Sequence, residues 1–130
     1  MDILVVDDFE PIRDEMVDLI REQKHMRVVG EASNGREAID KADEIEPDLV
    51  VMDVMMPILN GIEATKAIHK AHPDMLLLAL SNHTGTRLVE TVIEAGAKGY
   101  VRKDQAYEEL IPAINTVSKG ELYVGDNVKD

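Results

Sequence analysis

Apolar and polar positions along this 130-residue chain follow two alternating periods. Short runs rich in aliphatic residues, typical of buried strands, cover residues 3–6, 27–32, 49–52, 75–80 and 99–101. The segments between them repeat apolar residues every three or four positions, as in Ile12, Met16 and Ile20, which is the period of an amphipathic helix. Because five strand–helix units follow one another through short connections, the pattern predicts an α/β fold with a parallel sheet and helices on both faces.

Local signals place the ends of the predicted helices. Pro11 lies early in the first helix, where a missing N–H is tolerated. Asn34 and Glu37 predict a capping pair at the start of the second helix, and Pro47 ends that helix. The last predicted helix ends before Gly120. We therefore expect one domain over residues 1–120 and a tail, or the start of a linker, over residues 121–130.

Composition and charge narrow the classes of function. The net charge of −12 opposes binding to phosphate backbones and anionic membranes, so we expect no direct nucleic-acid binding and no membrane binding by this chain. The absence of cysteine excludes disulfides and thiolate metal sites. No secretory signal is visible, and the longest apolar stretch, residues 49–59, is interrupted by Asp53 and Pro57. We expect a cytoplasmic protein.

Polar side chains follow four of the predicted strands closely. Asp7 and Asp8 come after the first strand, Asp53 after the third, Ser81 after the fourth and Lys103 after the fifth. In an open α/β sheet, ligands bind beyond the carboxyl ends of the strands, where these side chains would meet. Three carboxylates held close repel one another, and a divalent cation relieves the repulsion. Because all the ligands would be oxygen atoms, the expected cation is Mg²⁺.

This combination of residue types predicts phosphoryl transfer. Asp53 would be the nucleophile, since carboxylates are known covalent phosphoryl acceptors. Lys103 would neutralise one phosphoryl oxygen and Ser81 would donate to another. Taken singly, Ser81 reads equally well as a loop residue and Lys103 as a surface charge. Asp53 resists such a reading, because an unpaired carboxylate within an apolar run is costly to bury.

The same residues, in this order and spacing, resemble a receiver domain of a two-component response regulator. The resemblance runs from Asp2 to about Lys119. It rests on the acidic pair Asp7 and Asp8, on residues 53–57 followed by Asn60 and Gly61, on Ser81, and on Tyr100 followed by Lys103. It implies a CheY-like (flavodoxin-like) fold whose five strands have the order 2-1-3-4-5.

For the acidic pocket, the resemblance implies that Asp53 accepts a phosphoryl group from a sensor histidine kinase. Asp8, Asp53 and the backbone carbonyl of Met55 would hold Mg²⁺, and Asp7 would assist through a water molecule. We accordingly expect a phosphoacceptor that assists its own phosphotransfer and dephosphorylation, and not an enzyme.

For the switch, the resemblance implies that Lys103 and Ser81 bind the phosphoryl group. Ser81 and Tyr100 match the family's switch pair, in which the hydroxyl moves toward the phosphate and the ring turns inward. Two positions depart from common patterns: Ser81 replaces Thr, and Asp104 replaces the Pro that often follows the lysine with a cis peptide bond. A cis bond before a residue other than Pro costs about 3 kcal/mol or more, which leaves the geometry of this loop open.

The expected output surface lies beside the switch residues and comprises residues 84–95, 99–101 and 106–118. His83, two positions after Ser81, is expected near the mouth of the pocket. Plain loop exposure is the first interpretation of this residue, and a modulator of water access to phosphorylated Asp53 is the alternative.

Residues 95–104, 109–110, 113–114 and 120–123 are similar to receivers of regulators with a LuxR-type (NarL/FixJ-like) helix-turn-helix. This similarity implies control of transcription through a DNA-binding domain that is not in this chain, with a homodimer forming on phosphorylation. The alternative is a stand-alone single-domain response regulator, or a phosphorelay intermediate, that acts through protein–protein interaction.

Two other uses of such a fold fit less well. A phosphatase of the haloacid dehalogenase type needs a second Asp two residues after the first, where this chain has Phe9 and Met55. A flavodoxin-like electron carrier needs a loop rich in Ser, Thr and Gly after the first strand, and here the acidic residues 7–10 would repel the phosphate of FMN.

Overall fold

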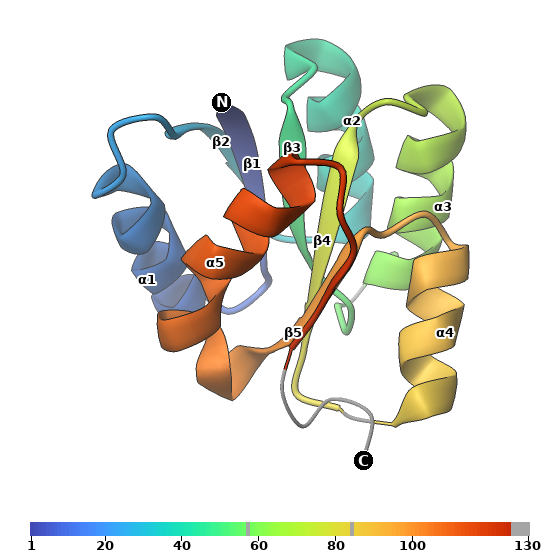
Figure 1. The fold of residues 1–130 in the computed structure, drawn as a ribbon. Coiled ribbons are helices and arrows are strands. Elements are labelled where there is room, and N and C mark those ends of the chain that lie inside the picture. Colours follow the sequence, from blue (N-terminus) through green and yellow to red (C-terminus); the bar gives the residue numbers. More distant parts are fainter. Residues whose placement is uncertain (57, 84, 126–130) are drawn as a thin grey trace.

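The computed structural model describes residues 1–56, 58–83 and 85–125, and a parallel sheet runs through its centre (Figure 1). Within these residues the sheet has six strands in the order β2-β1-β3-β4-β5-β6. Every neighbouring pair of strands is parallel. The strands are β1 (Asp2–Val6), β2 (Arg27–Ala32), β3 (Leu49–Asp53), β4 (Leu76–Ser81), β5 (Gly99–Arg102) and β6 (Tyr123–Val124).

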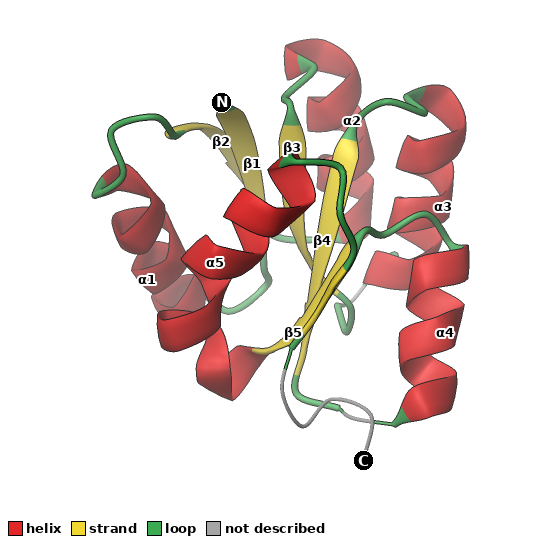
Figure 2. Ribbon diagram, viewed as in Figure 1, coloured by secondary structure: helices red, strands yellow, loops and turns green. Residues whose placement is uncertain are grey.

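Helices cover both faces of this sheet, which confirms the predicted layers (Figure 2). On one face α1 and α5 pack over the strands, and on the other face α2, α3 and α4 do so. The helices are α1 (Glu10–Arg21), α2 (Gly35–Ile45), α3 (Gly61–Ala71), α4 (Thr86–Glu94) and α5 (Ala106–Ser118). None of the helices in the described part of the chain is long and apolar enough to cross a bilayer.

The core consists of two apolar clusters separated by the sheet. Successive side chains of β1 point to opposite faces, so Leu4 and Val6 join the cluster under α2, α3 and α4. Ile3 and Val5 join the cluster under α1 and α5. Because both faces are covered, the strand is apolar at every one of these positions, as is usual for parallel sheets.

The helix starts follow the local signals in the sequence. The Asn34 side chain accepts a hydrogen bond from the Glu37 N–H at 2.9 Å, and the Glu37 carboxylate accepts one from the Ser33 N–H at 3.0 Å. Pro11 lies in the first turn of α1. The predicted capping pair is therefore confirmed: the Asn34 oxygen satisfies a backbone donor that the helix leaves free, and the Glu37 carboxylate binds the N–H of the residue before the cap.

The prediction of five strands is wrong, because a sixth strand lies within the segment that we expected to be a tail. β6 pairs with β5, with the Tyr123 N–H donating to the Lys98 carbonyl at 3.0 Å and the Gly125 N–H to the Tyr100 carbonyl at 2.8 Å. The Tyr123 hydroxyl also donates to Glu109 of α5 at 2.7 Å. Residues 126–130 of the predicted tail lie outside the described residues, and the domain boundary at residue 120 stays a prediction.

Strand register brings the predicted site residues to the same edge of the sheet. Met52 pairs with both Val6 and Ala79, and Ser81 pairs with Arg102, so the four strands end at nearly the same level. Gly61, the first residue of α3, fits tightly here: an added Cβ would lie 2.1 Å from the Asp53 carbonyl oxygen. Only glycine lets α3 begin this close to the end of β3.

Candidate functional site

The acidic pair lies in the loop between β1 and α1. Asp7 is fully buried, and its Oδ1 accepts a hydrogen bond from the Phe9 N–H at 2.9 Å. Its own N–H donates to the Ala32 carbonyl at 3.1 Å, which extends the pairing of β1 with β2 by one residue. Asp8 is exposed. One carboxylate is thus held inside the protein while its neighbour faces the solvent.

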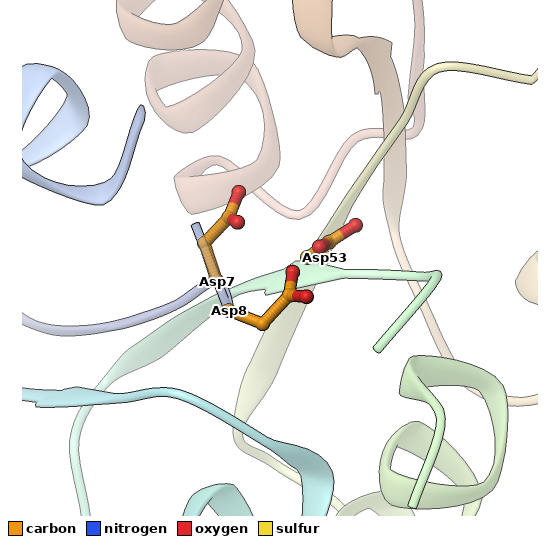
Figure 3. A group of neighbouring side chains, drawn as sticks. All are labelled: Asp7, Asp8 and Asp53. Atoms are coloured by element: carbon orange, nitrogen blue, oxygen red, sulfur yellow. The ribbon is translucent and has the colours of Figure 1, made fainter. Parts of the chain in front are cut away.

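Asp53 is the last residue of β3 and lies beside this pair. Its side chain is buried, and its Oδ1 accepts a hydrogen bond from the Met55 N–H at 3.2 Å. Figure 3 shows the side chains of Asp7, Asp8 and Asp53 gathered beyond the ends of β1 and β3. One carboxylate oxygen from each lies within 4.8 Å of the others. The structure therefore brings together the three predicted carboxylates.

Lys103 is the cation that faces this group. It begins the 3₁₀ turn η1 (Lys103–Gln105) after β5, and its Nζ lies 2.9 Å from Asp7 Oδ2 and 3.1 Å from Asp53 Oδ2. Its side chain is only 12 % exposed. Two buried carboxylates share a single partly buried ammonium group, which leaves a net negative charge at this edge of the sheet.

Burial and the neighbouring charges together set the protonation of the site. Burial, helped by repulsion from Asp7, raises the pKa of Asp53 from 3.8 to about 7, although Lys103 and the Met55 N–H oppose the rise. Burial lowers the pKa of Lys103, but its contacts with Asp7 and Asp53 outweigh burial, and the net direction of its pKa is upward. Near neutral pH the lysine stays charged, whereas Asp53 is poised between its two protonation states.

The donor set fits a hard divalent cation. Asp7 Oδ2 is buried, and its partner is the Lys103 Nζ at 2.9 Å. Asp7, Asp8 and Asp53 each offer a carboxylate oxygen to the site, and oxygen is the type of ligand that Mg²⁺ prefers. A cation bound here, in addition to the Lys103 ammonium group, would offset the repulsion from Asp7 that helps to raise the pKa of Asp53. The contact found for Met55 is through its N–H, and the role of its carbonyl stays a prediction.

Ser81, Tyr100 and the backbone of His83 form a second linked group beside the acidic pocket. The Ser81 Oγ accepts a hydrogen bond from the His83 N–H at 3.0 Å. The Tyr100 hydroxyl donates to the His83 carbonyl at 3.0 Å, and the Tyr100 ring is fully buried. Burial also raises the pKa of Tyr100. The backbone of His83 therefore joins the ends of β4 and β5, while the residue as a whole is exposed.

The loop after Lys103 takes an ordinary backbone form. No peptide bond in the described residues is cis, so the bond between Lys103 and Asp104 is trans. Asp104 instead pairs with Arg102, with 2.6 Å between Arg102 Nη2 and Asp104 Oδ2. Pro57, which belongs to the sequence pattern around Asp53, lies outside the described residues.

One contact of the acidic loop was not foreseen from the sequence. The Arg13 Nη1 donates to the Asp7 carbonyl at 2.8 Å, and its Nε donates to Glu31 at 3.1 Å. An arginine in the first turns of a helix carries no signal of such a role, because only the fold brings a backbone carbonyl within its reach.

Comparison with known proteins gives consistent matches. The family profile described as "Response regulator receiver domain" matches residues 3–115. Transcriptional regulatory protein LnrK of Bacillus subtilis (strain 168) is 36 % identical over 120 residues, which cover 92 % of this chain and 54 % of LnrK. Response regulator GacA of Pseudomonas viridiflava is 34 % identical over 126 residues, which cover 97 % of this chain and 59 % of GacA. The chain thus spans little more than half the length of these relatives.

A solved structure agrees with the fold over nearly the whole chain. The crystal structure of a two-component response regulator of the LuxR family from Aurantimonas sp. SI85-9A1 matches with a TM-score of 0.93 and 34 % sequence identity. The match covers 98 % of this chain and 91 % of that one.

Replacing Asp53 with Asn should stabilise the metal-free protein, and more strongly at pH 8 than at pH 5. The pKa of Asp53 is raised from 3.8 to about 7. At a pH between these two values, Asp53 is protonated in the folded state and ionised in the unfolded state. The contribution of this group to the free energy of unfolding therefore falls as the pH rises through that window. We expect the stabilisation by Asn to grow by roughly 2 kcal/mol from pH 5 to pH 8, measured by urea unfolding in EDTA.

Asp40→Asn is the matched control, because the Asp40 side chain is 63 % exposed and its pairing with Arg36 is on the surface. It should change stability little at either pH. An effect of Asp53→Asn that is equal at both pH values, or a loss of stability, would contradict the raised pKa.

Proposed function

This chain belongs to the receiver domains of two-component response regulators, of the LuxR type, and on that premise we propose that Asp53 accepts a phosphoryl group from a sensor histidine kinase. Receiver domains are in general signalling domains that bind Mg²⁺ at an acidic pocket and interact with such kinases. The observation that supports the proposal most directly is the meeting of Asp7, Asp8 and Asp53 around Lys103 at the carboxyl edge of the sheet.

Each residue of the pocket would have a separate task. Asp8, Asp53 and the Met55 carbonyl would hold Mg²⁺, with Asp7 assisting through a water molecule. When bound, the ion supplies positive charge to the phosphoryl oxygens. A carboxylate oxygen of Asp53 forms the new bond to phosphorus, and the bond from phosphorus to the donor's nitrogen breaks, with its electron pair leaving on the donor.

Lys103 and Ser81 would bind the transferred group. Lys103 already lies 3.1 Å from Asp53 Oδ2, within reach of an oxygen on the phosphorylated side chain. The Ser81 Oγ accepts a hydrogen bond from the His83 N–H, and its own hydroxyl would turn to donate to a phosphoryl oxygen. Catalysis then consists of positioning and charge neutralisation, which the chain supplies for its own modification.

The switch would pass through the backbone of His83. If the Ser81 hydroxyl moves toward the phosphoryl group, it pulls on the residue that also binds the Tyr100 hydroxyl. The phosphorylated form would thereby favour one arrangement of α4, β5 and α5, by a shift of populations. We place the output surface there. In the whole protein this surface would control transcription through a DNA-binding domain, with a homodimer forming on phosphorylation.

Acetyl phosphate with Mg²⁺ should add the mass of one phosphoryl group to the wild-type chain and none to Asp53→Asn, measured by intact mass spectrometry. Asp104→Asn, which alters an exposed carboxylate beside the pocket, should gain the same mass as the wild type. A wild-type chain that stays unmodified with the donor and Mg²⁺ present would rule out the phosphoacceptor role.

Replacing His83 with Ala should change the lifetime of phosphorylated Asp53, if its side chain affects the access of water to the pocket. The backbone contacts of His83 survive this substitution, so a change in the decay rate would belong to the side chain alone. The decay is followed by intact mass after the donor is removed. An unchanged rate would leave His83 as an ordinary exposed loop residue.

Phosphorylation should also shift the backbone amide resonances of α4 and β5, measured by heteronuclear NMR on the same samples. The reason is the shared contact of Ser81 and Tyr100 with His83. Tyr100→Phe, which removes the hydroxyl and keeps the ring, should reduce the shifts in β5. Shifts confined to the loops around Asp53 would contradict the proposed output surface.

A further inference from the structure

Arg13 joins three elements around the acidic loop. It lies in the first turns of α1, where its side chain is 16 % exposed. Its Nη1 donates to the Asp7 carbonyl at 2.8 Å, and its Nε donates to Glu31 of β2 at 3.1 Å. Lys41 of α2 donates to the backbone carbonyl of the same Glu31. A single guanidinium thus ties the end of β1 to β2.

The carbonyl that Arg13 holds belongs to the peptide group between Asp7 and Asp8. The Asp7 N–H is bound to the Ala32 carbonyl, and its Oδ1 is bound by the Phe9 N–H. Without Arg13 this peptide group could rotate, because nothing else that we find in the described residues bonds to the Asp7 carbonyl. Its rotation would carry Asp8, the exposed member of the carboxylate group, away from Asp7 and Asp53.

We infer that Arg13 is a positioning residue for Mg²⁺: it fixes the Asp7–Asp8 peptide group so that the Asp8 carboxylate faces Asp53. The inference rests on the proposed function, and it adds a residue that holds a ligand without touching the ion. Arg suits this task because its planar guanidinium carries donors on separate nitrogens in a fixed fork, so that Nη1 reaches the Asp7 carbonyl while Nε reaches Glu31, whereas Lys has only one nitrogen.

Simple electrostatics makes the opposite prediction. A positive charge near a cation site repels the cation, so removing the charge of Arg13 should tighten Mg²⁺ binding if charge were its only effect. On the same reasoning, Arg13→Lys should bind Mg²⁺ as the wild type does. The positioning role predicts weaker binding in both variants, because neither keeps the two-acceptor fork.

Mg²⁺ titrations by isothermal calorimetry on the wild-type chain, Arg13→Ala and Arg13→Lys separate these cases. We expect the Kd for Mg²⁺ to rise about tenfold or more in Arg13→Ala, and by less in Arg13→Lys. The matched control is Arg36→Ala, since Arg36 is a 64 % exposed surface residue of α2 whose partner is Asp40. It should leave the Kd unchanged. Melting temperatures measured without Mg²⁺ establish whether each variant is folded. If Arg13→Ala is unfolded, the Kd of Arg13→Lys is the test of the positioning role.

The rate of phosphorylation by acetyl phosphate provides a second readout. The Mg²⁺ concentration for half-maximal rate should rise in the Arg13 variants, while the rate at saturating Mg²⁺ stays close to that of the wild type. A general loss of structure would lower the maximal rate instead. Tighter or unchanged Mg²⁺ binding in Arg13→Ala and Arg13→Lys would overturn the positioning role of Arg13 and leave the proposed function standing. Absence of Mg²⁺ binding by the wild type would overturn the proposed function and this inference together.

Discussion

Two buried carboxylates, Asp7 and Asp53, face one partly buried ammonium group, Lys103, at the carboxyl edge of the sheet. This cluster is buried and short of positive charge, and burial, helped by the repulsion from Asp7, raises the pKa of Asp53. An uncompensated charge of this kind is unfavourable for folding, yet it is what a site for a divalent cation and a phosphoryl group needs. The cost in folding stability and the suitability for binding a cation therefore come from the same three residues.

The rest of the fold serves to hold these groups close. Parallel strands with both faces covered direct their carboxyl ends to one edge, so residues far apart in the sequence arrive within a few ångströms of each other. Gly61 lets α3 start directly against β3, and Arg13 anchors the loop after β1. A neighbouring set of contacts through the His83 backbone connects this edge to Tyr100, whose buried ring belongs to the apolar cluster that also contains α4.

Much of this arrangement could be predicted from the sequence, for identifiable physical reasons. The alternation of periods determines the layers, and the meeting of Asp7, Asp53 and Lys103 follows from their places at strand ends. β6 could not be predicted, because two residues are too few to show a period, and its pairing depends on where β5 and α5 leave a free edge. Arg13 escaped notice because its acceptor is a backbone carbonyl, which leaves no mark in a sequence. The chemical roles of the site residues remain predictions.

The central claim is that the acidic pocket is short of positive charge, which a divalent cation supplies. The most direct test is a pH titration of the aspartate carboxyl carbons by ¹³C NMR, with Asp53 assigned through Asp53→Asn, in EDTA and again in Mg²⁺. The account predicts a midpoint for Asp53 near the pKa of about 7 without the ion, and a much lower midpoint with it. A midpoint near the ordinary value of 3.8 in EDTA, unmoved by Mg²⁺, would contradict it.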